Sequence, residues 1–248
     1  MRNHTLLTAL CVAAVPAATI SATPIFDDFG SFPNATFGGS GIPTDSVAAS
    51  TQIIDGDTEI TIALSATQRF NNPPLTNDGA GTYFATPGSN IPTGSSLEGA
   101  RWNFNFYVEV RSLSGLNDPS ISDYAFDLLY DFDAGVDTPF GSLGVIDFDL
   151  TAPTATISTF EDFSDGQIAQ GSQNLLFGFL GASTPPFLTP PAGSFDPNEL
   201  GEYTFAIFVE DAGGFGIESV AIDVVVPEPG TLALLGLGSL GLIRRTRR

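Results

Sequence analysis

Apolar and polar residues alternate with a period of two along much of the chain, a pattern that predicts β-strands with one buried and one solvated face. The run 101–111 shows this alternation best. Its expected inward residues are Trp102, Phe104, Phe106, Val108 and Val110. Its expected outward residues are Arg101, Asn103, Asn105, Glu109 and Arg111. Convincing helical periodicity is absent, so the pattern favours an all-β fold.

A second alternating run covers 123–133. Its expected inward residues are Tyr124, Phe126, Leu128, Tyr130 and Phe132. Its expected outward residues are Asp123, Asp127, Asp131 and Asp133. Further strands are predicted at 58–64, 144–150, 174–180, 203–210 and 217–226.

The last two predicted strands are joined by 211–216, which contains three glycines. Glycine takes the positive φ that tight hairpins require, so these strands should form an antiparallel hairpin. The segment 201–205, Gly-Glu-Tyr-Thr-Phe, resembles the penultimate strand of immunoglobulin-like sandwiches, where a tyrosine near the strand start bonds back to the backbone. No Cys-Trp-Cys pattern accompanies it. The prediction is therefore an antiparallel β-sandwich, immunoglobulin-like or jelly-roll-like.

Two long irregular stretches, 71–96 and 184–198, interrupt the predicted strands. They are surface loops or an internal boundary. We expect one sandwich over 23–226, with two smaller β units divided near residue 96 as the alternative.

The first 22 residues have the order of a secretory signal peptide: Arg2, an apolar run over 6–18, and small residues up to Ala22. The predicted cleavage follows Ala22, with Ala17 as the alternative. The apolar run is shorter than the roughly 20 residues that a membrane span needs. Leu10 precedes Cys11, whereas lipid attachment requires a small residue there, so Cys11 is interpreted as part of the apolar region.

The other end carries Pro227, Glu228 and Pro229, thirteen apolar or small residues over 231–243, and then Arg244, Arg245, Arg247 and Arg248. Cations beyond an apolar stretch tend to stay in the cytoplasm, so the body should lie outside. A helix of this length spans about 20 Å, against a hydrocarbon core of about 30 Å. The tail is expected to be a short hydrophobic sorting helix that stays in the inner membrane until it is cut. A permanent transmembrane anchor is the alternative.

Together, the motif, apolar stretch and arginine cluster of 227–248 resemble the PEP-CTERM sorting signal of Gram-negative bacteria. The resemblance implies processing by an exosortase, a transpeptidase-like membrane enzyme, and an association with exopolysaccharide or biofilm production. It also implies an inner-membrane-associated precursor that ends at the cell surface or in the extracellular matrix. The order of motifs from Tyr130 to Val226 resembles the body regions of many PEP-CTERM proteins, which carry no activity that can be transferred.

Composition narrows the chemistry of the body. Of the chain's 28 acidic residues all but Glu228 lie within 23–226, where the basic residues are Arg69, Arg101 and Arg111, giving a charge near −24. Such a body should repel nucleic acid and anionic lipid. The body contains no histidine, cysteine, methionine or lysine. This excludes His-based triads, cysteine nucleophiles and His or Cys metal ligands.

Asp131, Asp133 and Asp137 alternate around Gly135, an arrangement that is similar to calcium loops but does not fit the EF-hand. They form a candidate calcium site, and the alternative is a solvated strand end. No other cofactor is expected.

Glycoside hydrolysis needs only two carboxylates, about 5–9 Å apart. The available glutamates are Glu109, Glu161, Glu202 and Glu210. Acidic residues are so common here that this signal is unspecific, and Trp102, a candidate sugar platform, is expected in the core. The leading hypothesis is a non-catalytic surface or matrix protein. The alternatives are a calcium-dependent glycan-binding module and a carboxylate-based glycosidase.

Overall fold

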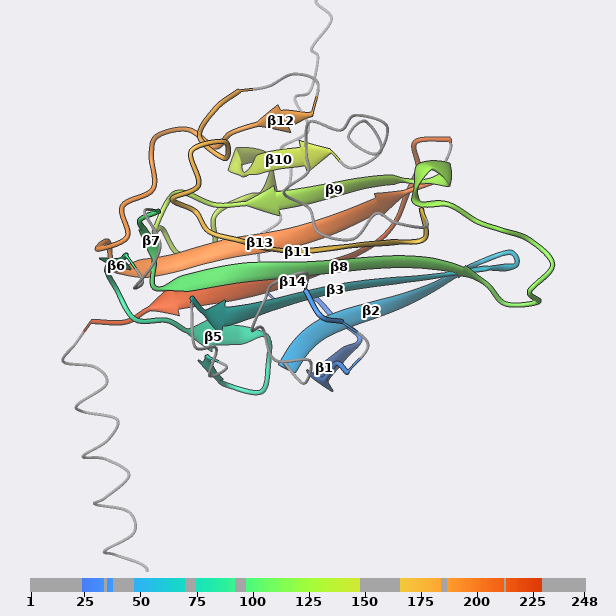
Figure 1. Ribbon diagram of the computed structural model, residues 1–248, viewed down its shortest axis with the longest axis horizontal. Helices are drawn as coiled ribbons and strands as arrows, with labels where there is room; N and C mark the ends of the chain where they lie inside the picture. Colours follow the sequence, from blue (N-terminus) through green and yellow to red (C-terminus); the bar gives the residue numbers. More distant parts are fainter. Residues whose placement is uncertain are drawn as a thin grey trace, which may run out of the picture.

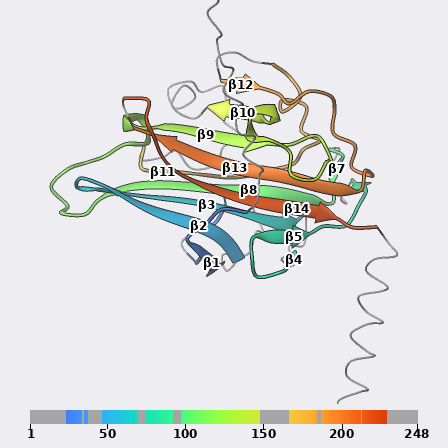
Figure 2. The same cartoon turned by 180° about the vertical axis from the view of Figure 1, so that it is seen from behind.

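Two β-sheets face each other in the computed structural model, which describes residues 24–33, 35–37, 47–69, 75–91, 97–147, 166–183, 187–211 and 213–228 (Figures 1 and 2). The five-stranded sheet has the order β1 (Asp28–Ser31), β2 (Val47–Asp55), β3 (Thr58–Gln68), β8 (Trp102–Ser112), β11 (Ile168–Gln173). The seven-stranded sheet has the order β12 (Leu188–Thr189), β10 (Gly144–Asp147), β9 (Ala125–Tyr130), β13 (Gly201–Glu210), β14 (Gly216–Val226), β5 (Thr82–Phe84), β4 (Thr76–Asn77). The predicted all-β fold is confirmed.

Smaller elements complete the described chain. They are a two-stranded ladder of β6 (Ser89–Asn90) and β7 (Gly99–Ala100), and two short 3-10 helices, η1 (Ile121–Asp123) and η2 (Phe140–Ser142). Strands are paired antiparallel except β14 with β5, which run parallel. Strands from both sides of residue 96 occur in the seven-stranded sheet and in the five-stranded sheet. The predicted body limits, 23 and 226, stay a prediction.

The core lies between the two sheets and uses the predicted inward residues. All of those predicted on β8 and on the run 123–133, which contains β9, are buried: Trp102, Phe104, Phe106, Val108, Val110, Tyr124, Phe126, Leu128, Tyr130 and Phe132. The Phe104 ring of β8 stacks on the Phe205 ring of β13 with centroids 4.6 Å apart, which joins the sheets. Trp102 packs against Tyr203 at 5.7 Å, so its assignment to the core is confirmed. Burying each such side chain stabilises the fold by about 1.5–3 kcal/mol.

The outer face of β8 is only partly solvated, which differs from the prediction. Asn105 and Tyr107 are buried: Phe32, Ala35 and Phe37 pack with Tyr107, and the Asn105 amide donates to the Thr67 hydroxyl at 3.2 Å. Phe32 packs edge-on against Tyr107 at 5.3 Å, and the Phe37 backbone donates to Gln170 Oε1 at 2.8 Å. Asn105 therefore does not face solvent as expected.

The predicted strand at 174–180 is wrong. The segment forms successive turns, in which the Phe177 N–H donates to Asn174 O at 2.8 Å and the Leu180 N–H donates to Phe177 O at 3.0 Å. The Asn174 side chain explains why the chain leaves the sheet here. It accepts from the Ala100 N–H at 2.9 Å and donates to Trp102 O at 2.9 Å. Strands β2 and β11 were not anticipated, and β10 matches the start of the strand predicted over 144–150, of which 148–150 lie outside the described residues.

The predicted hairpin of β13 and β14 is confirmed, with pairing from Gly201↔Val226 to Glu210↔Gly216. Gly214 in its turn has a φ of 75°. The Tyr203 hydroxyl donates to the backbone oxygen of Glu199 at 3.4 Å, so the tyrosine contact expected from the sandwich resemblance is present.

The first described residues connect the two sheets. Ile25 pairs with Ala221 of β14, through bonds of 2.9 and 2.7 Å, and the Asp27 N–H donates to Ser50 O of β2 at 3.0 Å. A Cβ at Gly81 would lie 2.5 Å from the Pro24 Cβ, so only glycine lets the segment pass. The start of the described chain is thus part of the folded body.

Candidate functional site: the tail exit

The last strand leads directly into the sorting motif. Val226 is 2% exposed and pairs with Gly201. Val225 accepts a hydrogen bond from the Ala85 N–H at 2.8 Å. Pro227 is half-buried and Glu228 is exposed, whereas Pro229 and Arg244, Arg245, Arg247 and Arg248 lie outside the described residues. The motif therefore begins where the sheet ends, with no linker between them.

Two loops flank this tail exit, which lies at the left of Figure 1 where β14 ends. The loop 131–137 follows β9 and is attached to the start of β13, since the Glu202 N–H donates to Ala134 O at 3.2 Å and the Asp137 N–H donates to Glu202 Oε1 at 3.0 Å. A Cβ at Gly201 would lie 2.0 Å from Ala134 O, so this contact requires glycine. The loop 196–200 precedes β13 directly. Its Pro197 O accepts from the Gly88 N–H at 2.6 Å.

Carboxylates gather around the exit and form what we call the acidic rim. Its members are exposed or half-buried: Asp133, Asp137, Asp196, Glu199, Glu202 and Glu228. Burial, then the charges of Glu199 and Asp196, raises the pKa of Tyr203 above its ordinary value. Carboxylates of both loops thus contribute to the raised pKa of Tyr203. The rim is rich in negative charge, and the exposed Arg101 borders it, because its guanidinium lies beside Gly88, which donates to Pro197 O.

The structure places the three predicted calcium ligands on one loop. Asp131 is 1% exposed, so its expected outward position is wrong; its carboxylate points back to the loop and accepts the Asp133 N–H at 2.8 Å. Burial raises the pKa of Asp131, opposed by this backbone hydrogen bond. Asp133 accepts the Gly135 N–H at 3.1 Å, and Asp137 has a φ of 54°. Within the described ranges, no group of three acidic side chains is placed to hold a metal ion.

Calcium binding by Asp131, Asp133 and Asp137 stays a prediction. Binding to the folded state alone would raise the Tm of the mature protein by a few degrees at millimolar calcium, by mass action. Sodium at matched ionic strength is the control, because screening also relieves the repulsion of an acidic body. The hypothesis requires that calcium exceed sodium and that Asp133→Asn abolish the difference. If calcium raises the Tm of Asp133→Asn as much as that of the wild type, the stabilisation is due to charge screening and not to a calcium site.

A further carboxylate near the exit was not anticipated. Asp223 of β14 is 4% exposed and accepts from the Thr204 hydroxyl at 3.0 Å. Burial, followed by the charge of Glu202, raises its pKa from 3.8 to about 7. The available sequence signal is an aspartate between Ile222 and Val224 in the last strand. The strand over 217–226 was predicted, but no local pattern indicates that Asp223 is buried in it.

Replacing Asp223 by asparagine should remove a pH-dependent loss of stability. Because the folded pKa of about 7 lies above the ordinary 3.8, folding favours the protonated form. This contribution is complete below about pH 4 and is lost as the pH rises to about 7. Asp223→Asn should raise the free energy of unfolding by about 2–3 kcal/mol at about pH 8 and change it little at about pH 4. Urea denaturation at both pH values measures this, with the exposed Asp118→Asn as control. An equal gain from the control would point to net charge instead.

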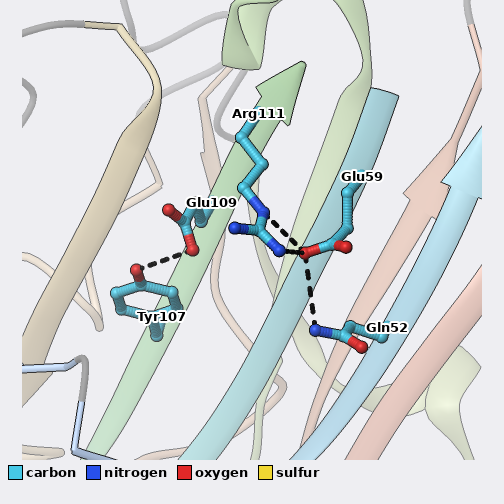
Figure 3. A network of polar contacts seen from close by, with 5 residues as sticks. All are labelled: Gln52, Glu59, Tyr107, Glu109 and Arg111. Atoms are coloured by element: carbon cyan, nitrogen blue, oxygen red, sulfur yellow. Dashed lines mark hydrogen bonds and ion pairs between the residues drawn. The ribbon is translucent and has the colours of Figure 1, made fainter. Parts of the chain in front are cut away.

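A polar network covers part of the outer face of the five-stranded sheet (Figure 3). Glu59 of β3 forms an ion pair with Arg111 of β8, with Oε1 2.5 Å from Nη2 and 2.6 Å from Nε. The same oxygen accepts from Gln52 Nε2 at 3.4 Å, and the Tyr107 hydroxyl donates to Glu109 at 3.1 Å. We call these five residues the polar network.

The glutamates considered for glycoside hydrolysis do not come together. Glu202 and Glu210 are eight residues apart on β13, which corresponds to about 26 Å. Glu109 lies in the other sheet, and Glu161 lies outside the described residues. The sequence did not identify Glu59, whose register places it diagonally from Glu109.

Comparison with known proteins locates one familiar element. The family model for the PEP-CTERM protein-sorting motif matches residues 225–248. No curated protein and no solved structure matches the chain. The match indicates an exported protein. Its precursor passes through the membrane, and the protein ends at the cell surface. The chain is a PEP-CTERM sorting domain-containing protein, and the motif implies processing by the membrane enzyme exosortase.

The predicted signal peptide over 1–22 and the predicted apolar tract over 231–243 both lie outside the described residues. In the part of the chain that the structure describes, no helix is long and apolar enough to cross a membrane.

Proposed function

We propose that the folded body is a non-catalytic component of the cell surface or exopolysaccharide matrix, which the sorting tail delivers. Its composition supports this, because a body without histidine, cysteine or lysine has few groups for nucleophilic or acid–base chemistry. Its charge near −24 also makes neutral glycans better partners than anionic ones.

The polar network is the observation that carries the proposal. Glu59 and Glu109 are diagonal neighbours across β3 and β8, the geometry that comes nearest to a glycosidase pair. However, Glu59 Oε1 already receives Arg111 Nε and Nη2 and Gln52 Nε2. A general acid must present its proton to a leaving group, and this oxygen is occupied by donors. The network therefore suits binding better than catalysis.

The same network offers sugar-binding chemistry. Gln52 and Arg111 are exposed, and Glu109 is half-buried beside them. Amide, guanidinium and carboxylate groups on one face of the sheet can donate to and accept from sugar hydroxyls. A weak contact repeated over many copies would hold the protein in a polysaccharide matrix by avidity.

Co-sedimentation of the mature protein with the host's exopolysaccharide tests this function. We expect binding without release of new reducing ends, and an approximately tenfold weaker affinity for the Gln52→Ala/Arg111→Lys variant, which loses about 1.4 kcal/mol of hydrogen bonding. Lysine keeps the charge opposite Glu59, and a thermal melt checks the fold. Glu218→Gln is the control on the other sheet. Reducing-end release that disappears in Glu59→Gln or Glu109→Gln would contradict the non-catalytic role.

A calcium-dependent glycan-binding module is the second candidate, since Asp131, Asp133 and Asp137 lie on one loop at the tail exit. Binding that a chelator abolishes, and that is insensitive to Gln52→Ala/Arg111→Lys, would favour this candidate over the polar network.

A further inference from the structure

The sorting motif overlaps the folded body. The family match begins at Val225, and both Val225 and Val226 are residues of β14. Val226 belongs to the core cluster, and Val225 is paired on both sides, with Glu202 of β13 and Phe84 of β5. An enzyme that binds Pro227–Pro229 therefore also contacts the surface around Val226.

The distance to the membrane makes this contact hard to avoid. Residues 227–230 separate β14 from the apolar tract, and four residues span at most about 14 Å when fully extended. While the tract is in the bilayer, the tail exit is held within that distance of the membrane surface. A membrane enzyme can reach the motif only by entering this space, against the end of the sandwich.

The surface that it meets is the acidic rim. Asp133 and Asp137 lie on one side of the exit, and Asp196 and Glu199 lie on the other loop. The buried Asp131 belongs to the same loop as Asp133 and Asp137, and its carboxylate accepts the Asp133 N–H at 2.8 Å.

From this juxtaposition we propose that the acidic rim is the docking surface for the exosortase, which presents basic side chains to it. The proposal rests on the sorting role of the tail and is independent of the matrix function proposed above. Charge complementarity of this kind mainly raises the rate of association.

Four neutralising substitutions test the rim: Asp133→Asn, Asp137→Asn, Asp196→Asn and Glu199→Gln. Asparagine keeps the oxygens that accept the Gly135 and Asn198 backbone N–H groups. In the native host, pulse-chase labelling with analysis of the C-terminal peptide follows tail removal from the full chain. We expect removal to slow about tenfold.

The matched control neutralises four exposed or half-buried acids at the opposite end of the sandwich: Asp118→Asn, Asp123→Asn, Asp211→Asn and Glu218→Gln. This control should be processed at the wild-type rate. A second pair of chains carries a flexible Gly-Ser spacer of about ten residues between Val226 and Pro227, long enough to separate the motif from the rim. With the spacer, rim variant and wild type should be processed equally.

Three results would overturn the proposal. An unchanged rate in the rim variant would show that the enzyme does not use these charges, and equal slowing in the control would assign the effect to net charge. Faster removal would mean that the rim acts through repulsion from anionic lipid. If the wild type itself keeps its tail, the sorting role fails instead.

Discussion

In the native host, the mature protein is expected to begin at Thr23 and to lack everything after the Pro227–Pro229 region. The reason is a conflict between length and charge in the tail. The tract 231–243 is about 20 Å long as a helix, too short for a hydrocarbon core of about 30 Å, whereas Arg244–Arg248 prevent it from passing through. Such a segment holds the precursor only until it is cut, and the protein then leaves the inner membrane.

A host without an exosortase provides the comparison. There the signal peptide should still be removed, but the tail should remain and keep nearly all of the protein in the membrane fraction. Mass spectrometry of the C-terminal peptide from both hosts measures the difference. Finding Arg244–Arg248 on surface-localised protein in the native host would show that the tail is a permanent anchor.

The Asn174→Ala variant should lose about 3–5 kcal/mol of stability, the largest effect that we expect from a polar residue of the body. The Asn174 amide is 0% exposed. Its Oδ1 accepts from the N–H groups of Ala100 and Leu176, at 2.9 and 3.2 Å. Its Nδ2 lies 3.0 Å from Ala100 O, 2.9 Å from Trp102 O and 2.7 Å from Asn103 Oδ1. Alanine would leave several of these buried groups without partners.

Guanidinium denaturation of the mature protein measures this loss. The control is Asn117→Ala, which removes an exposed amide that donates to Asp57 at 2.9 Å and should cost at most about 1 kcal/mol. Similar losses in the two variants would mean that water replaces the Asn174 contacts, and that the amide is not what directs the chain out of the sheet.

Period-two alternation predicted the fold well where the interior of the sandwich decides burial. It identified the residues of β8 and β9 that form the core between the sheets, as well as the β13–β14 hairpin, but not the buried Tyr107 and Leu129 on the other faces of these strands. It failed at two polar positions expected to face solvent. Asn105 is 0% exposed and donates to the Thr67 hydroxyl, and Asp131 is 1% exposed and accepts the Asp133 N–H. At 174–180 the apolar residues resembled a strand, but the Asn174 side chain takes the backbone groups at 100 and 102 and turns the chain away.

The sorting motif and the acidic rim also differ in how well the sequence alone predicts them. The sorting motif is a local pattern, so the sequence alone predicted it, and the family match confirms it. The acidic rim is assembled from the loops 131–137 and 196–200, from Glu202 of β13 and from Glu228 after β14, which only the fold brings to one end. Asp223 likewise became notable only when its burial was known, because a single aspartate in a strand of an acidic chain carries little signal.

The position of β14 also sets the order in which export and folding are completed. This last strand lies inside the seven-stranded sheet, between β13 and β5, and Ala221 on it pairs with Ile25 from the start of the described chain. Without β14, the sheet falls into two pieces, β12-β10-β9-β13 and β5-β4. A chain that crosses the membrane from its N-terminus therefore cannot complete the seven-stranded sheet until residues 216–226 have emerged. By then the tract at 231–243 has entered the bilayer, so the body closes at the membrane surface and not earlier in transit.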